Sequence, residues 1–141
     1  MTPRTDATLS MSDADFEALV AEGISAIPER FLSRLENIAI VIADTPTPEQ
    51  LAYAGLGERD AMELLGLYEG IPLPERGAEY GMVLPDRITV FKLPTLEEAE
   101  GDRERVREIV RDTVWHEIGH YFGYDDEAIE AREDAGTNHS Y

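Results

Sequence analysis

Hydrophobic residues recur at helical spacing near the start of the chain. The apolar positions that follow residue 12 are Phe16, Leu19, Val20 and Ile24. Their spacing predicts a helix over residues 13–23, with Ser12 as its N-cap. A second short helix is predicted to begin at Pro28. The preceding segment is polar and unpatterned, so residues 1–11 are predicted to form a disordered tail.

Three short apolar runs predict strands. The first, Asn37–Asp44, is a continuous β-branched run, which is typical of a strand buried on both faces. A short helix or irregular turn is predicted at residues 48–56. The second strand, Leu64–Gly70, is weaker because it contains Gly66, and the third, Arg87–Leu93, alternates between two faces. Together with the helices, these strands predict an α+β fold in which a small sheet packs against helices.

A long helix without internal proline is predicted from about Asp102 to Phe122. One stripe along it consists of Val106, Val110, Thr113, Glu117 and Tyr121. Its last two turns are apolar nearly all round, so we expect them to be buried. The acidic segment at 97–108 is interpreted as a solvated helix start, and a further short helix is predicted at about 126–133.

The chain is expected to form one domain, residues 12–135, followed by a polar tail at 136–141.

The composition restricts the possible functions. Thirty acidic residues against 12 basic ones give a formal charge of −18, which repels phosphate backbones and anionic lipid, so neither nucleic acid nor membrane is expected as a partner. The absence of cysteine excludes disulfides and thiolate-bound metals. No apolar segment has the length of a signal peptide or a membrane span, so a cytoplasmic location is expected.

The segment "HEIGHYFGYDD" contains the candidate chemistry. His116 and His120 lie one helical turn apart, so both imidazoles can reach one metal ion. Gly123 follows the predicted helix end, where a left-handed residue turns the chain, and this turn can bring Asp126 back beneath the histidines. Two imidazoles and a carboxylate suit Zn²⁺ and leave one position open for water. Burial would also be costly for these polar groups unless they had partners, and a metal supplies one.

Several alternatives remain open. The two histidines could instead be core residues that bond to nearby acceptors. Other candidates for the third ligand are Asp125, Glu127, Glu130 and His139. An oxyanion formed during catalysis would need a stabilising donor, and the tyrosines that could provide it are Tyr80, Tyr121 and Tyr124. A packing role is at least as well supported for each tyrosine.

The motif HExxHxxGxxD resembles that of the zincin metallopeptidases, and most of all the mini-zincins, a family of small bacterial zinc metallopeptidases. The likeness extends to "LGLYEG", "GMVLPDRITVF" and "DDEAIE" and spans about residues 13–133. It implies a minimal zincin-like fold with a small mixed sheet beside the active-site helix. It also implies one zinc ion per chain, held by His116, His120 and Asp126, with Glu117 as the catalytic acid/base. The chain departs from most metzincins in ending the motif with aspartate and in lacking methionine after residue 82.

These residues predict a zinc-dependent metallopeptidase, a hydrolase of peptide bonds. Glu117 would accept a proton from the zinc-activated water and pass it to the leaving amine. The predicted strand Leu64–Gly70 could form a sheet edge that receives an extended peptide or protein substrate, although an ordinary edge strand is equally expected. The alternative function is a zinc-containing peptide-binding module without turnover. A purely structural metal is disfavoured because the chain lacks cysteine and contains Glu117.

Overall fold

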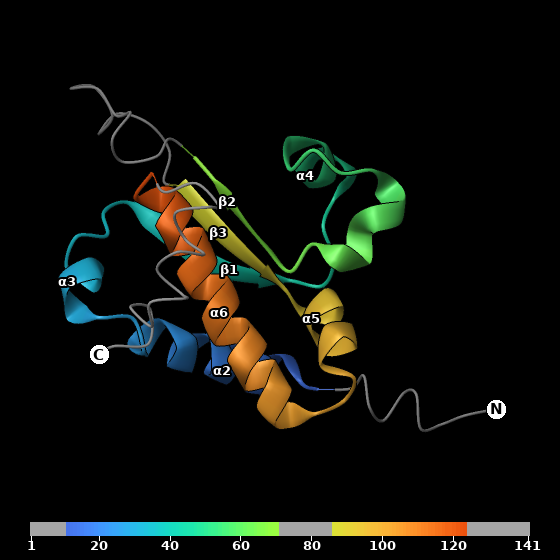
Figure 1. Ribbon diagram of the computed structural model, residues 1–141, viewed down its shortest axis with the longest axis horizontal. Coiled ribbons are helices and arrows are strands. Elements are labelled where there is room, and N and C mark those ends of the chain that lie inside the picture. Colours follow the sequence, from blue (N-terminus) through green and yellow to red (C-terminus); the bar gives the residue numbers. More distant parts are fainter. Residues whose placement is uncertain (1–10, 71–85, 124–141) are drawn as a thin grey trace.

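The computed structural model describes residues 11–70 and 86–123 (Figure 1). In chain order its elements are helices α2 (Asp13–Ser25) and α3 (Glu29–Leu32), strand β1 (Ile38–Ala43), helix α4 (Pro48–Tyr53), 3₁₀ helix η1 (Glu58–Glu63), strands β2 (Gly66–Glu69) and β3 (Asp86–Phe91), and helices α5 (Lys92–Ala99) and α6 (Arg103–Tyr121). The predicted α+β class is confirmed. The predicted domain limits, with tails at 1–11 and 136–141 around a domain at 12–135, stay a prediction.

The three described strands form one mixed sheet in the order β1-β3-β2. The central strand β3 runs parallel to β1, with Ile40 opposite Ile88. It runs antiparallel to β2, with Gly66 opposite Val90. Both β1 and β2 are therefore edge strands of the described sheet, and β3 separates them.

Strand β1 differs from its prediction. The sequence favoured burial on both faces, but the strand is half-buried and Val41 is 40% exposed. The alternate residues Ile38, Ile40 and Ile42 pack against the core. The prediction was wrong because an edge strand with one covered face can still have apolar residues on its other face, and periodicity does not reveal this.

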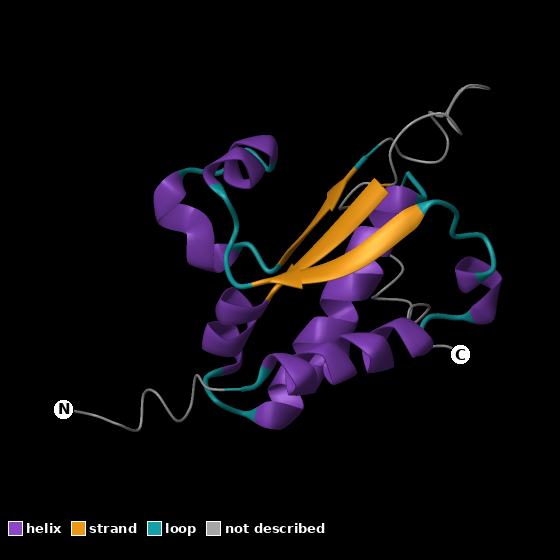
Figure 2. Cartoon of the chain, turned by 180° about the vertical axis from the view of Figure 1, so that it is seen from behind, coloured by secondary structure: helices purple, strands orange, loops and turns teal. Residues whose placement is uncertain are grey.

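Helices α2 and α6 pack against each other on one face of the sheet, as Figure 2 shows with the sheet in front of α6. The predicted helix at 13–23 is confirmed as α2, and Ser12 caps it by accepting a hydrogen bond from the Asp15 amide at 3.0 Å. The largest fully buried side chains of this layer include those of Phe16, Ile88, Val110, Ile118 and Tyr121. This layer is the main hydrophobic core, and α6 lies within it.

Helix α4 lies on the β2 side of the sheet (Figure 1). Its Gln50 donates a hydrogen bond from Nε2 to Oε1 of Glu69 at 3.1 Å. Side chains alternate along a strand, so Glu69 points away from the face on which its neighbour Tyr68 contacts Tyr121 of α6. The predicted short helix near residues 48–56 is confirmed as α4, and this hydrogen bond joins it to β2.

Helix α5 was not predicted. The third strand was predicted to extend to Leu93, and residues 97–108 were predicted to form the start of one helix. In the structure, β3 ends at Phe91 and α5 begins directly at Lys92. Pro94 lies in the first turn of α5, where its missing amide removes no helical hydrogen bond. Glu100 adopts a left-handed conformation with φ 54° and ends α5 before α6 begins. The acidic segment is therefore divided between two helices.

Among the described residues, no helix combines the length and apolar character needed to cross a membrane.

Candidate metal centre

The buried half of α6 positions the motif side chains. Asp102 caps the helix by accepting a hydrogen bond from the Glu104 amide at 2.9 Å. The predicted buried stripe is confirmed, with these residues each at most 8% exposed: Val106, Val110, Thr113, Glu117 and Tyr121. This buried stripe fixes the rotation of α6 against the sheet. This rotation places Glu117 inward and the two histidines beside it.

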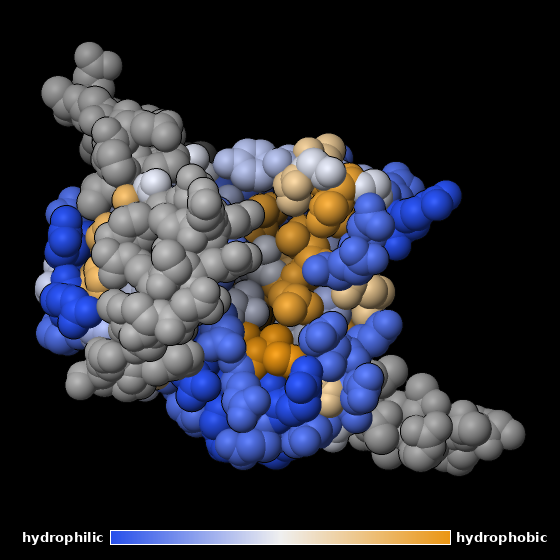
Figure 3. All heavy atoms as spheres, viewed as in Figure 1, coloured by the Kyte–Doolittle hydropathy of each residue, from blue (hydrophilic) through white to orange (hydrophobic). Residues whose placement is uncertain are grey.

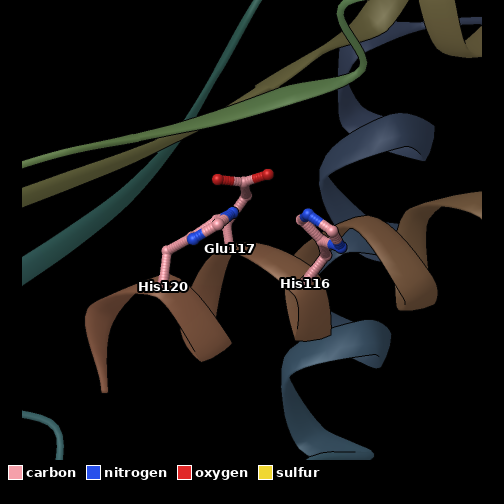
Figure 4. A group of neighbouring side chains, drawn as sticks. All are labelled: His116, Glu117 and His120. Carbon is pink, nitrogen blue, oxygen red and sulfur yellow. The ribbon is translucent and has the colours of Figure 1, made fainter. Parts of the chain in front are cut away.

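His116 and His120 form a pair on α6. Their ring centroids are 5.0 Å apart, with 75° between the ring planes, and both side chains are half-buried. One ligand atom from each histidine and one carboxylate oxygen of Glu117 all lie within 4.8 Å of one another. Figure 4 shows the Glu117 carboxylate on the side of α6 that faces the sheet, with a histidine ring to either side.

This donor set fits a zinc ion. Two nitrogens bound to tetrahedral zinc at about 2.0–2.1 Å lie on the order of 3.3 Å apart. Since the histidine and glutamate ligand atoms are separated by at most 4.8 Å, side-chain rotation alone can bring the two nitrogens to this spacing. Imidazole nitrogen and carboxylate oxygen are also ligands that zinc prefers. His116 and His120 can therefore bind one metal ion from adjacent turns of the helix.

Gly66 explains how β2 approaches Glu117 so closely. A Cβ atom at this position would lie 2.5 Å from Cγ2 of Thr113 and 3.4 Å from Cγ of Glu117. The first distance is shorter than two carbon atoms tolerate, so a larger residue here would force α6 and β2 apart. The glycine that weakened the strand prediction is thus the residue that lets the strand cover the motif glutamate.

A cavity of about 410 Å³ opens beside Glu117, between β2 and α6. Its lining residues are Leu64, Leu65, Gly66, Glu98, Ile109, Asp112, Thr113, His116 and Glu117. Figure 3 shows apolar surface gathered in a hollow between the more hydrophilic segments of the described chain. The sequence reasoning did not identify Glu98, Ile109 or Asp112 as site residues. Ile109 and Asp112 precede His116 at helical spacing, and this spacing could have indicated that they line the same site.

The end of α6 and the turn after it contain two residues considered in the sequence analysis, Gly123 and Tyr121. Gly123 has a φ of 90°, which confirms the left-handed residue predicted after the helix. The Tyr121 hydroxyl accepts a hydrogen bond from the Glu36 amide at 2.9 Å and donates one to the Glu36 carbonyl at 3.1 Å. Because this side chain is fully buried, it packs within the core and leaves no surface for substrate.

The remaining candidates lie outside the described residues. Asp126, the predicted third ligand, is one of them. The same holds for the alternatives Asp125, Glu127, Glu130 and His139, for Tyr80 and Tyr124, and for the predicted helix at 126–133. The third ligand therefore stays a prediction.

The edge of β2, helix α6 and the histidine pair with Glu117 together form a group that could hold a metal ion. Residues 35–136 match the model of the family described as zincin-like metallopeptidases. This match covers more than half of the 141 residues, so the chain belongs to the zincin-like metallopeptidase family. No protein among the curated ones that were searched matches the chain. The family resemblance and the minimal zincin-like fold inferred from the sequence are both confirmed.

Proposed function

We propose that this chain is a zinc-dependent metallopeptidase that hydrolyses peptide bonds, with one zinc ion held by His116, His120 and Asp126. The main support is the half-buried histidine pair, whose ligand atoms lie within 4.8 Å of a buried Glu117 carboxylate oxygen. The adjoining cavity leaves room for a substrate beside these groups. The family match agrees with this class of reaction.

Glu117 is the proposed general base. When bound, zinc would polarise the scissile carbonyl and lower the pKa of a water molecule. The Glu117 carboxylate accepts a proton from the attacking water and then passes it to the leaving nitrogen. Its buried position between α6 and β2 restricts the carboxylate to few orientations, which favours this role. Because Glu117 directly follows His116, it leaves the helix about 100° away from that ligand.

The proposed substrate is a peptide or protein that lies along β2. This strand has a neighbouring strand only on its β3 side within the described sheet, so its other edge can receive an extended peptide. Gly66 begins this strand, Leu64 and Leu65 directly precede it, and all three line the cavity. A peptide at this edge would therefore pass next to Glu117. A cytoplasmic location stays a prediction.

A zinc-containing peptide-binding module without turnover is the alternative. The cavity and the edge of β2 would hold a peptide whether or not Glu117 accepts a proton. The two functions differ in their need for a basic carboxylate at position 117, so one substitution can separate them.

Glu117→Gln tests the proposed function. This substitution nearly preserves side-chain size but removes the basic carboxylate, so hydrolysis is expected to fall by about 10²–10⁴-fold while zinc and peptide remain bound. The measurement is digestion of a mixed-peptide library, read by mass spectrometry, together with the bound zinc. Glu108→Gln, at an exposed position on the same helix, is the matched control and should cleave normally. A wild-type protein that retains zinc and peptide but cleaves nothing would favour the binding module.

The third ligand has its own test. Asp126→Ala is expected to lower the bound zinc well below the roughly one ion per chain of the wild type, because it removes one of three protein ligands. Asp125→Ala is the control and is expected to retain zinc. Equal losses in the two variants, or a loss only on changing Glu130 or His139, would assign the ligand to another residue.

A further inference from the structure

The cavity beside Glu117 has apolar walls. Leu64 and Leu65 line it next to β2, and Ile109 lines it from α6. All three residues are half-buried, so each keeps apolar surface that a ligand can cover. Transfer of such surface out of water is favourable and needs no directional partner. The walls therefore suit an apolar group of a substrate.

The two acidic residues of the lining, Glu98 and Asp112, extend toward solvent. Their side chains are 60% and 52% exposed, and each lies near an arginine: Arg105 is 4.0 Å from Glu98, and Arg111 is 3.9 Å from Asp112. Carboxylates with this exposure keep most of their hydration when an apolar group enters the cavity. They therefore impose little cost on an apolar occupant, and the three apolar residues determine which side chain fits.

The cavity extends along α6 away from the histidine pair. Ile109 precedes His116 by two helical turns, and both residues line the cavity. Two turns of an α-helix correspond to roughly 11 Å. One end of the cavity therefore lies at the candidate metal ligands, and Ile109 lies near the other. This length suits a side chain of several carbon atoms, and the residue at position 109 decides how far that side chain can extend.

Gly66 connects this cavity to the edge of β2. Its contacts with Thr113 and Glu117, and the contact of Tyr68 with Tyr121, show that alternate residues of β2 face α6. Because Gly66 lets β2 lie directly against α6, a peptide paired with the edge of β2 that faces away from β3 lies only about 4.8 Å further out. Every second side chain of that peptide would also face α6, so one of them would enter the cavity beside Glu117.

We propose that the cavity beside Glu117 is a subsite for a large apolar side chain of the substrate, such as that of phenylalanine, and that Ile109 limits the size of this side chain. The volume of about 410 Å³ accommodates one such side chain. Leu64 and Leu65 would contact one side of it, and Ile109 would contact its end. This inference rests on the proposed function, because the side chain enters from a peptide bound along β2.

The mixed-peptide library provides the first test. Wild-type cleavage sites are expected to be enriched in phenylalanine, leucine and methionine at one fixed position relative to the scissile bond. Three peptides that differ only at this position, with alanine, phenylalanine or tryptophan, are then compared. The phenylalanine peptide is expected to exceed the alanine peptide in kcat/KM by at least about tenfold, because the larger side chain buries more apolar surface in the cavity.

Variants at position 109 test the assignment of Ile109. Ile109→Trp fills the far end of the cavity, so it is expected to lower kcat/KM for the phenylalanine peptide by about tenfold and to leave the alanine peptide within about twofold of the wild type. Ile109→Ala lengthens the cavity, so it is expected to raise kcat/KM for the tryptophan peptide relative to the phenylalanine peptide. A purely structural effect of either substitution would change all three peptides alike.

Two controls make this result specific. Ile24→Ala alters another half-buried isoleucine that packs against the same core, on α2 and outside the described lining of the cavity, and it is expected to keep the wild-type order of the three peptides. Peptide affinity is also measured by fluorescence anisotropy in the zinc-loaded Glu117→Gln variant, where no turnover is needed. There the phenylalanine peptide is expected to bind more tightly than the alanine peptide, and addition of Ile109→Trp is expected to remove this difference.

The outcomes distinguish the two proposals. Cleavage without any preference for large apolar residues, or an equal effect on all three peptides in both variants at position 109, would overturn the apolar subsite and leave the peptidase intact. Absence of cleavage, with a preference for phenylalanine in binding that Ile109→Trp removes, would overturn the peptidase and support the subsite. Neither cleavage nor such a preference in binding would overturn both.

Discussion

The two edge strands of the sheet differ in what lies against them. Strand β1 packs only alternate residues against the core, and its Val41 is 40% exposed. In β2, Gly66, Leu67 and Tyr68 are buried, and Thr113 and Glu117 of α6 lie directly against the glycine. No residue of β1 lines the described cavity, whereas Gly66 does. One edge therefore completes the core, and the other also shapes the candidate metal centre.

The difference shows how close packing and candidate chemistry coincide at one edge. Tyr68 of β2 contacts the ring of Tyr121 and donates a hydrogen bond to Asp86 at 2.6 Å. These contacts hold β2 to both β3 and α6. Substitutions at β2 should therefore affect stability, and at Gly66 they should also affect activity, whereas substitutions on the outer face of β1 should affect neither.

The largest effect is expected for Gly66→Ala. The new methyl group would collide with Cγ2 of Thr113, so we expect a loss of about 1–3 kcal/mol in the free energy of unfolding and a strong loss of hydrolysis. Urea denaturation and peptide cleavage provide the two measurements. Thr113→Ser removes the colliding methyl and keeps the hydroxyl, so the double variant should recover much of both losses. Strictly additive losses would show that this contact does not determine the approach of β2.

Tyr68→Phe ranks second because its effect is expected on stability and not on activity. It removes a hydrogen bond from a buried tyrosine to the buried carboxyl of Asp86, which costs about 1–3 kcal/mol. The ring and its contact with Tyr121 remain, so zinc binding should persist. Urea denaturation and zinc analysis test this expectation. A variant as stable as the wild type would mean that other partners of Asp86 compensate fully.

The smallest effect is expected for Val41→Thr on β1. The side chain is exposed, and threonine keeps both the size and the β-branching, so the free energy of unfolding should change by no more than about 0.5 kcal/mol. Peptide cleavage should match the wild type. A clear loss of activity would contradict the division of roles between the two edges.

Local features of the sequence predicted the motif helix well. The apolar stripe of α6, the histidine spacing and the left-handed Gly123 all depend on residues within a few turns of one another, and the structure confirms their placement. The burial of Glu117 followed from the same periodicity. The third ligand lies outside the described residues, so its assignment to Asp126 stays a prediction.

Features that depend on distant parts of the chain were not predictable in this way. The order β1-β3-β2 places the strongest apolar run at an edge, although its sequence is typical of a central strand. Glu98 lines the cavity with Asp112 because α5 ends beside α6, and hydrophobic periodicity did not reveal α5 as a separate helix. Gly66 was interpreted only as a weak strand residue, because its neighbour Thr113 lies 47 positions further along the chain.

The double hydrogen bond of Tyr121 has a consequence for spectroscopy. Its hydroxyl holds the amide of Glu36, on the segment leading into β1, to the turn of α6 that also contains His120. This amide proton can exchange with solvent only when that turn separates from the segment, so its exchange rate reports the opening free energy of one end of the metal centre. One amide resonance would thus show whether metal binding tightens the helix end.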